Sequence, residues 1–345
     1  FILAFMKYIR LLLLPFSALY SLMIRLRHFC YDRQILSSRE FDFPVICVGN
    51  LSLGGTGKSP MIEFLLRHLE SDFQMATLSR GYKRKTTGFV ELQSESTAAD
   101  VGDEPLQFKT NFPQQIIAVD EDRVHGVERL RELHPHLKGV FLDDSFQHRK
   151  IKAGLNILLT TFDALYVDDF LLPAGNLRDS TAAANRADLV IVTKCPSELS
   201  EEHRIKVRKK LRLKQDQQLF FSQISYDQNI YSIETQMSLA ELDDFVLVTG
   251  IAKPKSLVNY LKQLGKKFQH ENFSDHHHFS EKEIQDLKSS GKKILSTTKD
   301  FMRLKPYFQD AEIFHLPITS DFYGKEKQVL KPIYDFMHSF STSNQ

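Results

Sequence analysis

Short apolar runs recur along the first two thirds of the chain, and stretches with the spacing of amphipathic helices separate several of them. The clearest such stretch covers residues 122–134. The runs are Val45–Val48, Met75–Leu78, Gln115–Val119, Val140–Leu142, Leu155–Leu159 and Leu189–Val192. Short apolar strands that alternate with helices are typical of parallel sheets with crossover helices. The pattern therefore predicts an α/β fold, with a mostly parallel sheet and flanking helices.

A second α/β unit is expected to begin near residue 236. Its predicted elements are a strand at Phe245–Thr249, a helix at 255–264, and strands at Lys293–Ser296 and Ile313–Leu316. A chain of 345 residues is long enough for two domains with cores of their own. We therefore expect a membrane-interface helix in 1–30, a core domain in 31–235 and a smaller α/β domain in 236–345.

The N-terminal segment is apolar but too short to be a clear membrane span. Its longest uncharged run, 11–24, has 14 residues, whereas a bilayer takes about 20. Arg25, Arg27 and Arg33 follow it, and no small-residue cleavage site of a signal peptide is evident. Three interpretations remain: a helix in the membrane interface, a helix packed on the domain, and a true span. The apolar face with a basic flank favours the first.

Charge and cysteine content exclude some classes of protein. The 45 Lys and Arg nearly balance the 43 Asp and Glu, which argues against a general nucleic-acid binder. The three cysteines lie far apart and match neither a metal site nor a disulfide framework, as suits a reducing cytoplasm. One stretch, 204–212, is strongly basic. It is either a solvated helix face or a basic surface for acidic lipid headgroups.

A glycine-rich loop follows the first apolar run of the core. Residues 49–60 read Gly-Asn-Leu-Ser-Leu-Gly-Gly-Thr-Gly-Lys-Ser-Pro, and an amphipathic pattern begins directly after them. The glycines allow backbone N–H groups to approach phosphate oxygens, and the helix N-terminus adds positive potential. Lys58 supplies charge to the β- and γ-phosphates and Ser59 a hydroxyl for Mg²⁺. The predicted nucleotide-binding residues of the loop are Gly54, Gly55, Thr56, Gly57, Lys58 and Ser59.

The loop departs from the usual G-x-x-x-x-G-K-[ST] pattern because Ser52 stands at its first glycine position. An ordinary strand–turn–helix is the alternative interpretation. The apolar strand before the loop and the amphipathic helix after it favour a phosphate-binding loop. The chain is therefore expected to bind ATP or GTP.

Two carboxylates end another apolar strand. Residues 139–142 lead into Asp143 and Asp144, and in nucleotide-binding α/β proteins such a strand lies beside the phosphate loop and its acid holds Mg²⁺. An acidic turn after a core strand is the alternative. Ser59, Asp143 and Asp144 form the predicted magnesium site.

Further polar clusters lie where loops should follow strands. They are residues 79–84, 102–105 and 120–123, each of which taken alone is also typical of solvated surface. The polar stretch 145–149 directly follows the paired acids and is a candidate to face a substrate. Loops at the carboxyl ends of parallel strands bind the ligands of such sheets. The clusters are therefore expected to share one crevice with the paired acids.

Contiguous histidines form the last cluster, at 275–278, with His270 nearby. Three interpretations remain: surface histidines, a zinc site, and a histidine poised beside a catalytic carboxylate, where its near-neutral pKa is useful.

Together these residues resemble the tetraacyldisaccharide 4′-kinase family, the lipid A 4′-kinases of Gram-negative bacteria. The resemblance extends from the N-terminal apolar segment to about residue 320. The motifs that carry it are residues 48–60, 78–82, 102–105, 122–123, 143–148, 172–178, 275–276 and 297–300, in the order of the family.

The resemblance implies a P-loop kinase with a second, smaller domain. It implies a peripheral or monotopic location on the cytoplasmic face of the inner membrane, with no nucleic acid and no obligate protein as partner. The enzyme would transfer the γ-phosphate of ATP, with Mg²⁺, to the 4′-hydroxyl of a lipid A disaccharide precursor, a tetraacyldisaccharide 1-phosphate. The product would be lipid IVA.

Roles for individual residues also come from the resemblance. It implies Asp103 as base with His276 assisting, Lys58 at the transferred phosphate, and Arg178 and Asp179 at the nucleotide. The implied substrate-binding residues are Asn50, Ser79, Tyr82, Arg123, Gln147 and His148. Two positions depart from the family: Ser145 replaces a common glycine, and Asp179 is one methylene shorter than the frequent glutamate. The second departure leaves open whether Asp179 contacts nucleotide or metal.

Two other functions compete with the kinase. A membrane-associated ATPase of the partitioning or positioning type would have a second lysine directly before Gly-Gly, where this chain has Leu53. A GTPase would have Asn/Thr-Lys-x-Asp after a strand, and residues 193–196, Thr-Lys-Cys-Pro, lack the aspartate.

Overall fold

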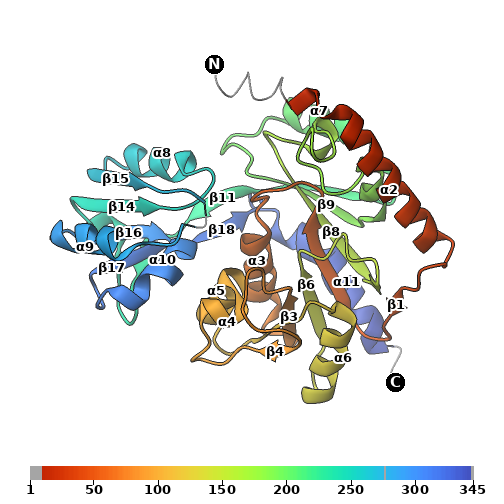
Figure 1. The fold of residues 1–345 in the computed structure, drawn as a ribbon, viewed down its shortest axis with the longest axis horizontal. Helices are drawn as coiled ribbons and strands as arrows, with labels where there is room; N and C mark the ends of the chain where they lie inside the picture. The colour runs from red at the N-terminus through yellow and green to blue at the C-terminus, as the bar shows by residue number, and fades with distance from the viewer. Residues whose placement is uncertain (1–9, 276, 343–345) are drawn as a thin grey trace.

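Two sheets organise the chain in the computed structural model, which describes residues 10–275 and 277–342 (Figure 1). The larger sheet has eight strands in the order β10-β9-β8-β2-β6-β3-β5-β4, all parallel except the antiparallel edge strand β4. Its strands are β2 (Val45–Asn50), β3 (Met75–Ser79), β4 (Val90–Glu91), β5 (Ile116–Val119), β6 (Gly139–Asp143), β8 (Leu155–Thr161), β9 (Leu189–Thr193) and β10 (Gln218–Phe221). The mixed α/β fold with mostly parallel strands is thus confirmed.

Helices cover both faces of the larger sheet, which explains why its central strands are continuous apolar runs rather than alternating ones. Every residue of β2, β3, β5, β6 and β9 is buried. The helices of this part are α3 (Lys58–Leu69), α4 (Ala98–Val101), α5 (Asp103–Asn111), α6 (Arg123–Leu133) and α7 (Glu201–Leu211), with 3₁₀ turns η1 (Tyr166–Asp168) and η2 (Thr181–Arg186). A small parallel pair, β1 (Arg39–Glu40) with β7 (Ile151–Lys152), lies apart from the sheet.

The smaller sheet has six strands in the order β13-β12-β17-β16-β14-β15. They are β12 (Asn229–Tyr231), β13 (Gln236–Ser238), β14 (Phe245–Thr249), β15 (Phe268–Asn272), β16 (Ile294–Thr297) and β17 (Ile313–Leu316). The accompanying helices are α8 (Lys255–Gln263), α9 (Glu281–Ser289) and α10 (Thr298–Leu304), with η3 (Leu239–Glu241) and η4 (Lys305–Tyr307).

An antiparallel strand pair connects the two sheets. The chain leaves the larger sheet through β11 (Gln223–Tyr226) and returns through β18 (Ile318–Asp321). Helix α11 (Glu326–Thr342) then packs on the larger sheet, because its buried side chains Val329, Ile333 and Met337 join the same core as α3. The division at 235/236 stays a prediction, but the C-terminal helix packs with the first unit and β12 of the second sheet begins at Asn229.

Helix α2 (Leu14–Asp32) lies along the outside of the larger unit (red in Figure 1). Its inner face packs on the protein: Ser17 Oγ donates to Leu171 O at 2.9 Å, Tyr20 Oη donates to Arg178 O at 3.0 Å, and Ile24 is buried. On its outward side and just before it, six large apolar side chains are at least 60% exposed, namely Leu12, Phe16, Leu19, Leu22, Met23 and Leu26. We call these six residues the apolar row.

In the described part of the chain, no helix is both long and apolar enough to cross a bilayer. The first nine residues of the predicted interface helix lie outside the described residues. The apolar row is therefore an exposed surface of a helix that is itself anchored to the domain.

A buried carboxyl group joins α3 to α5. Glu63 is 6% exposed, and its Oε1 accepts hydrogen bonds from Gln107 Nε2 at 2.7 Å and Asn111 Nδ2 at 2.9 Å. Burial disfavours the charged form and raises the pKa of Glu63 to about 7. The folded protein thus keeps a proton on Glu63 at acidic pH values where the unfolded chain has already released it.

We predict that the Glu63→Gln variant lacks the loss of folding stability that ionisation of Glu63 causes in wild type as pH rises. Glutamine retains the acceptor oxygen and never ionises, whereas wild-type Glu63 becomes less stabilising as pH rises from about 4.5 through 7. The difference in free energy of unfolding between the variant and wild type should shift in favour of the variant by up to about 3 kcal/mol from pH 5 to pH 8. Urea unfolding of both proteins at the two pH values measures this gain. The exposed Glu95→Gln serves as control, and a gap that does not change with pH would contradict the raised pKa.

Candidate active site

The predicted polar residues meet at one edge of the larger sheet because the parallel strands all end there. Asn50 ends β2, Ser79 ends β3, Asp143 ends β6 and Thr193 ends β9. The phosphate-loop segment leads from β2 into the N-terminus of α3. The shared edge of the sheet thus places the loops of the expected crevice next to one another.

The glycine-rich loop has the backbone that its sequence predicts. Gly54 and Gly57 have φ values of 102° and 89°, in the left-handed region that glycine tolerates, and Gly57 directly precedes α3. The loop is held from the β9 side: Thr193 Oγ1 donates to Thr56 O at 2.7 Å, and Lys194 Nζ donates to Gly55 O at 2.6 Å. These two carbonyls are therefore satisfied within the protein.

Cations surround one acid of the predicted pair. Lys58 Nζ lies 3.7 Å from Asp144 Oδ1, and the Arg178 guanidinium donates to both oxygens of Asp144, at 3.0 and 2.7 Å. Arg178 also donates to Asn50 Oδ1 at 2.5 Å. Burial works to raise the pKa of Asp144, but the Arg178 hydrogen bonds and Lys58 lower it below the usual range. Asp144 is thus an ionised anchor for two side chains beside the phosphate loop.

The other acid of the pair is buried and only half satisfied. Asp143 is 3% exposed, and Ser79 Oγ donates to its Oδ2 at 3.2 Å. Among the described residues, none donates a hydrogen bond to its Oδ1. Burial, reinforced by the nearby Glu104 carboxylate, raises the pKa of Asp143 to about 7. A buried carboxylate oxygen without a donor, beside the phosphate loop, is suited to ligate a cation.

Glu104 is a site residue that the sequence interpretation missed. Ser59 Oγ donates to Glu104 Oε1 at 3.1 Å, and Lys299 Nζ from α10 lies 2.5 Å from the same oxygen. Burial opposes ionisation, but Lys299 and Lys58 lower the pKa of Glu104 to about 2. Its sequence signal is its place as the second acid of the Gly-Asp-Glu-Pro motif at 102–105, in which only Asp103 had a predicted role.

Asp103, the predicted base, is the first residue of α5. Arg303 of α10 donates its Nε to Asp103 Oδ2 at 3.0 Å and makes a second contact through Nη2. Lys299 and Arg303 thus bring α10 of the smaller unit to the phosphate loop and to the base. His276, its predicted partner, lies outside the described residues.

The predicted substrate residues differ in their surroundings. Gln147 Nε2 donates to Asn50 O at 2.7 Å, which ties Gln147 to the end of β2. Tyr82 is 70% exposed, and His148 is about half buried, with its pKa lowered by burial and by nearby Arg123. Asn50 and Gln147 therefore lie together and Ser79 lies against Asp143, whereas Tyr82 projects into solvent.

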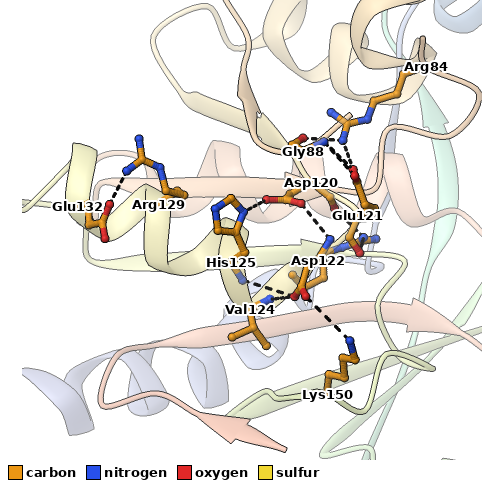
Figure 2. Close-up of polar contacts among 11 residues, drawn as sticks. Arg84, Gly88, Asp120, Glu121, Asp122, Val124, His125, Arg129, Glu132 and Lys150 are labelled. Atoms are coloured by element: carbon orange, nitrogen blue, oxygen red, sulfur yellow. Dashed lines mark hydrogen bonds and ion pairs between the residues drawn. The ribbon is translucent and has the colours of Figure 1, made fainter. Parts of the chain in front are cut away.

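Arg123 is buried at the start of α6, and the turn before it is firmly held. Its Nη1 donates to Asp120 O at 2.8 Å, while among the described residues its Nε has no acceptor. Figure 2 shows that turn: His125 Nδ1 lies 2.7 Å from Asp120 Oδ2, and Glu121 accepts from the Gly88 amide at 2.9 Å. The guanidinium is thus fixed by a braced loop and retains an unpaired donor.

Asp179 takes a position that the sequence did not suggest. It is 2% exposed, His28 Nε2 of α2 lies 2.6 Å from its Oδ1, and Arg186 Nη2 lies 3.3 Å from its Oδ2. A nucleotide contact by Asp179 stays a prediction, whereas these contacts tie it to α2. Asp179, whose side chain is shorter than the glutamate frequent in the family, is held by His28 and Arg186.

Among the residues that the structure describes, the histidine cluster forms no metal site. His277 Nε2 lies 3.1 Å from Glu283 at the start of α9, and His270 Nε2 lies 2.8 Å from Thr249 Oγ1. Both histidines thus contact neighbouring elements of the smaller unit.

The model of the family described as Tetraacyldisaccharide-1-P 4′-kinase matches residues 9–337. The chain belongs to this family. Membership along almost the whole sequence does not favour the partitioning ATPase or the GTPase.

Named relatives of this kinase family are similar over nearly their whole length. The "Tetraacyldisaccharide 4′-kinase" of Flavobacterium johnsoniae is 47% identical over 326 residues, which cover 93% of this chain and 95% of the relative. That of Bacteroides thetaiotaomicron is 43% identical, covering 90% and 84%. The crystal structure of "apo" form LpxK from Aquifex aeolicus in complex with ATP has a TM-score of 0.79 and 30% identity, covering 95% of this chain and 99% of that one.

Proposed function

We infer that this chain is a tetraacyldisaccharide 4′-kinase, which transfers the γ-phosphate of ATP to the 4′-hydroxyl of a tetraacyldisaccharide 1-phosphate. The product is the bisphosphorylated lipid IVA of lipid A biosynthesis. The observation that carries this inference is the phosphate loop between β2 and α3, with Lys58 and two acids beside it, in a chain of this family.

Nucleotide binding rests on the loop and on α3. Backbone N–H groups and the positive end of α3 bind the phosphates. Lys58 Nζ exchanges its contact with Asp144 for one with the negatively charged γ-phosphate. Arg178 is the second cation that contacts Asp144, and it is placed to contact the γ-phosphate as well. The ATP complex of the Aquifex aeolicus relative supports ATP as the nucleotide.

Oxygen donors that suit Mg²⁺ lie next to the phosphate loop. Ser59 Oγ contacts Glu104, and Asp143 has a buried oxygen without a donor. Mg²⁺ prefers a few carboxylates together with nucleotide phosphates. We therefore propose Ser59, Asp143 and Asp144, with Glu104 added, as the residues that hold it, directly or through water. When bound, the ion neutralises charge on the β- and γ-phosphates.

Asp103 is the proposed base. A sugar hydroxyl is a poor nucleophile, so a carboxylate that accepts its proton helps the oxygen attack phosphorus. Arg303 holds the Asp103 carboxylate through Nε at the first residue of α5. His276 remains its proposed assistant, and Asn50, Ser79, Tyr82, Arg123, Gln147 and His148 remain the proposed substrate residues.

The substrate's acyl chains stay in a bilayer, so the enzyme must reach the membrane surface. We propose that the apolar row of α2 enters the interface on the cytoplasmic face of the inner membrane. The row is exposed while the opposite face of the helix is hydrogen-bonded to the protein, as an interfacial helix requires.

The decisive assay incubates purified protein with γ-labelled ATP and a tetraacyldisaccharide 1-phosphate. We expect label in a second phosphate ester on the disaccharide. ATP hydrolysis without labelled lipid would instead support a nucleotide switch of the partitioning type.

We predict that Lys58→Ala lowers the rate of phosphate transfer by on the order of 10²–10³, because the γ-phosphate loses a fixed positive charge. Steady-state assays measure the rate, and an unchanged melting temperature controls for folding. The exposed Lys85→Ala should retain the wild-type rate. A Lys58 variant within fivefold of wild type would contradict the assignment of the loop.

We predict that Asp143→Asn raises the Mg²⁺ concentration needed for half-maximal rate, because an amide is a weaker ligand than a carboxylate. Asp144→Asn should lower the rate at saturating Mg²⁺ as well, because Arg178 and Lys58 lose their anchor. Titration of each variant with Mg²⁺ tests both statements. Wild-type Mg²⁺ dependence in both variants would refute the proposed site.

We predict that Asp103→Asn lowers kcat by about 10²–10⁴ with little change in the KM for ATP, because a base acts on the acceptor hydroxyl. Asparagine can still accept the Arg303 hydrogen bond, so folding should be retained. Initial rates at varied ATP give the two constants. A raised KM with normal kcat would move Asp103 to the nucleotide site.

We predict that replacing Phe16, Leu19, Met23 and Leu26 by serine weakens binding to phospholipid vesicles by at least 10²-fold. Burying one such side chain contributes about 1.5–3 kcal/mol. Activity on fully acylated substrate in vesicles should fall, while activity on a short-chain, dispersed analogue should not. Sedimentation with vesicles measures the binding, and equal binding by both proteins would place the membrane contact elsewhere.

A further inference from the structure

Helix α7 presents lysines on one side and packs the other into the protein. Lys206, Lys209 and Lys210 are exposed, and their spacing of three and four residues places them on a common side. Val207 and Leu211 are buried in the core of the larger unit. The acids of this helix, Glu201 and Glu202, stand in its first turn. We call the three lysines the α7 basic face; none of them takes part in the site described above.

A short chain of contacts connects the α7 basic face with α2. Lys210 Nζ lies 2.6 Å from Asp168 Oδ2, at the end of η1. The residues that follow η1 contact α2 and its start: Ser17 Oγ donates to Leu171 O at 2.9 Å, and Arg10 Nη1 donates to Asn176 Oδ1 at 3.1 Å. The segment 168–176 therefore connects the basic face to the helix that bears the apolar row.

The segment between the two helices is itself partly apolar at the surface. Phe170, two residues after Asp168, is 52% exposed, and Ile205 on α7 is 60% exposed. Large apolar side chains next to lysines are the composition of surfaces that lie at a membrane interface. Helix α2 thus contributes the apolar row and helix α7 contributes the lysines, on either side of the segment that contains Phe170.

We propose that the α7 basic face binds the anionic headgroups of the membrane that the apolar row enters. Lysines carry point charges on flexible stems, which suit a fluid surface of phosphates rather than one fixed ligand, and Lys210 shares its charge with Asp168. An apolar row beside the lysines favours a lipid surface over nucleic acid, as does the near balance of total charge. A second contact away from the α2 axis also limits rotation of the protein about that helix. The proposal rests on the proposed membrane contact of α2.

The test compares three proteins by sedimentation with two kinds of vesicle. The proteins are wild type, the triple variant Lys206→Gln, Lys209→Gln, Lys210→Gln, and a matched control of equal charge, Lys262→Gln, Lys267→Gln, Lys282→Gln, on exposed positions of the smaller unit. The vesicles are phosphatidylcholine alone and phosphatidylcholine mixed with phosphatidylglycerol. The substituted lysines are exposed, so all three proteins should fold, which their melting temperatures and their activity on a dispersed analogue verify.

We expect the α7 variant to lose affinity for the anionic vesicles by on the order of 100-fold, and to bind neutral vesicles as wild type does. The control triple should lose much less, and added salt should reduce the difference between the two variants. Equal affinities of the two variants for anionic vesicles would overturn the α7 proposal while leaving the α2 contact standing. Failure of wild type to bind either vesicle would overturn the membrane contact itself and this proposal with it.

Discussion

Three carboxylates lie beside the phosphate loop, with a fourth, Asp103, next to Glu104 in the chain, and basic side chains form ion pairs with three of the four. Like charges brought together away from water repel, and burial penalises each of them. Asp144 is held by Lys58 and Arg178, Glu104 by Lys299, and Asp103 by Arg303. Asp143 alone combines full burial with an oxygen that no described residue satisfies.

This charge balance explains why the two units are joined as they are. Lys299 and Arg303 both come from α10, which belongs to the smaller sheet, and they reach acids on α5 of the larger unit. The β11–β18 pair carries the chain out and back, and α11 then packs into the first core. Completion of the site therefore depends on how the smaller unit sits against the larger one. Any relative movement of the two would change the cations around Glu104 and Asp103.

Helix α2 is built in the opposite sense from an ordinary surface helix. Ser17 and Tyr20 make hydrogen bonds to the protein on its inner face, beside the buried Ile24, whereas the apolar row faces outward. Such an arrangement leaves apolar area in water unless another apolar phase covers it. His28 on the same helix contacts Asp179, which follows Arg178 of the active site, so the exposed helix is tied to the residues beside the nucleotide loop.

The sequence by itself determined six of the eight strands of the larger sheet, all but β4 and β10, together with the phosphate loop and the paired acids. These signals are local: a buried parallel strand needs a continuous apolar run, and the loop needs glycine where φ is positive, as at Gly54 and Gly57. Because parallel strands end at one edge, the sequence also predicted that the loop clusters at 79–84, 102–105 and 120–123 would share one crevice with Asp143 and Asp144.

Only the tertiary structure decided which charges face one another. Glu104 with Lys299 and Asp103 with Arg303 join residues about 200 positions apart, and Asp179 turns to His28, which lies 151 residues before it. The outward direction of the apolar row and the return of α11 to the first core were likewise decided by packing. Periodicity states that a helix has an apolar face, but the partner of that face is set by contacts between segments far apart in the chain.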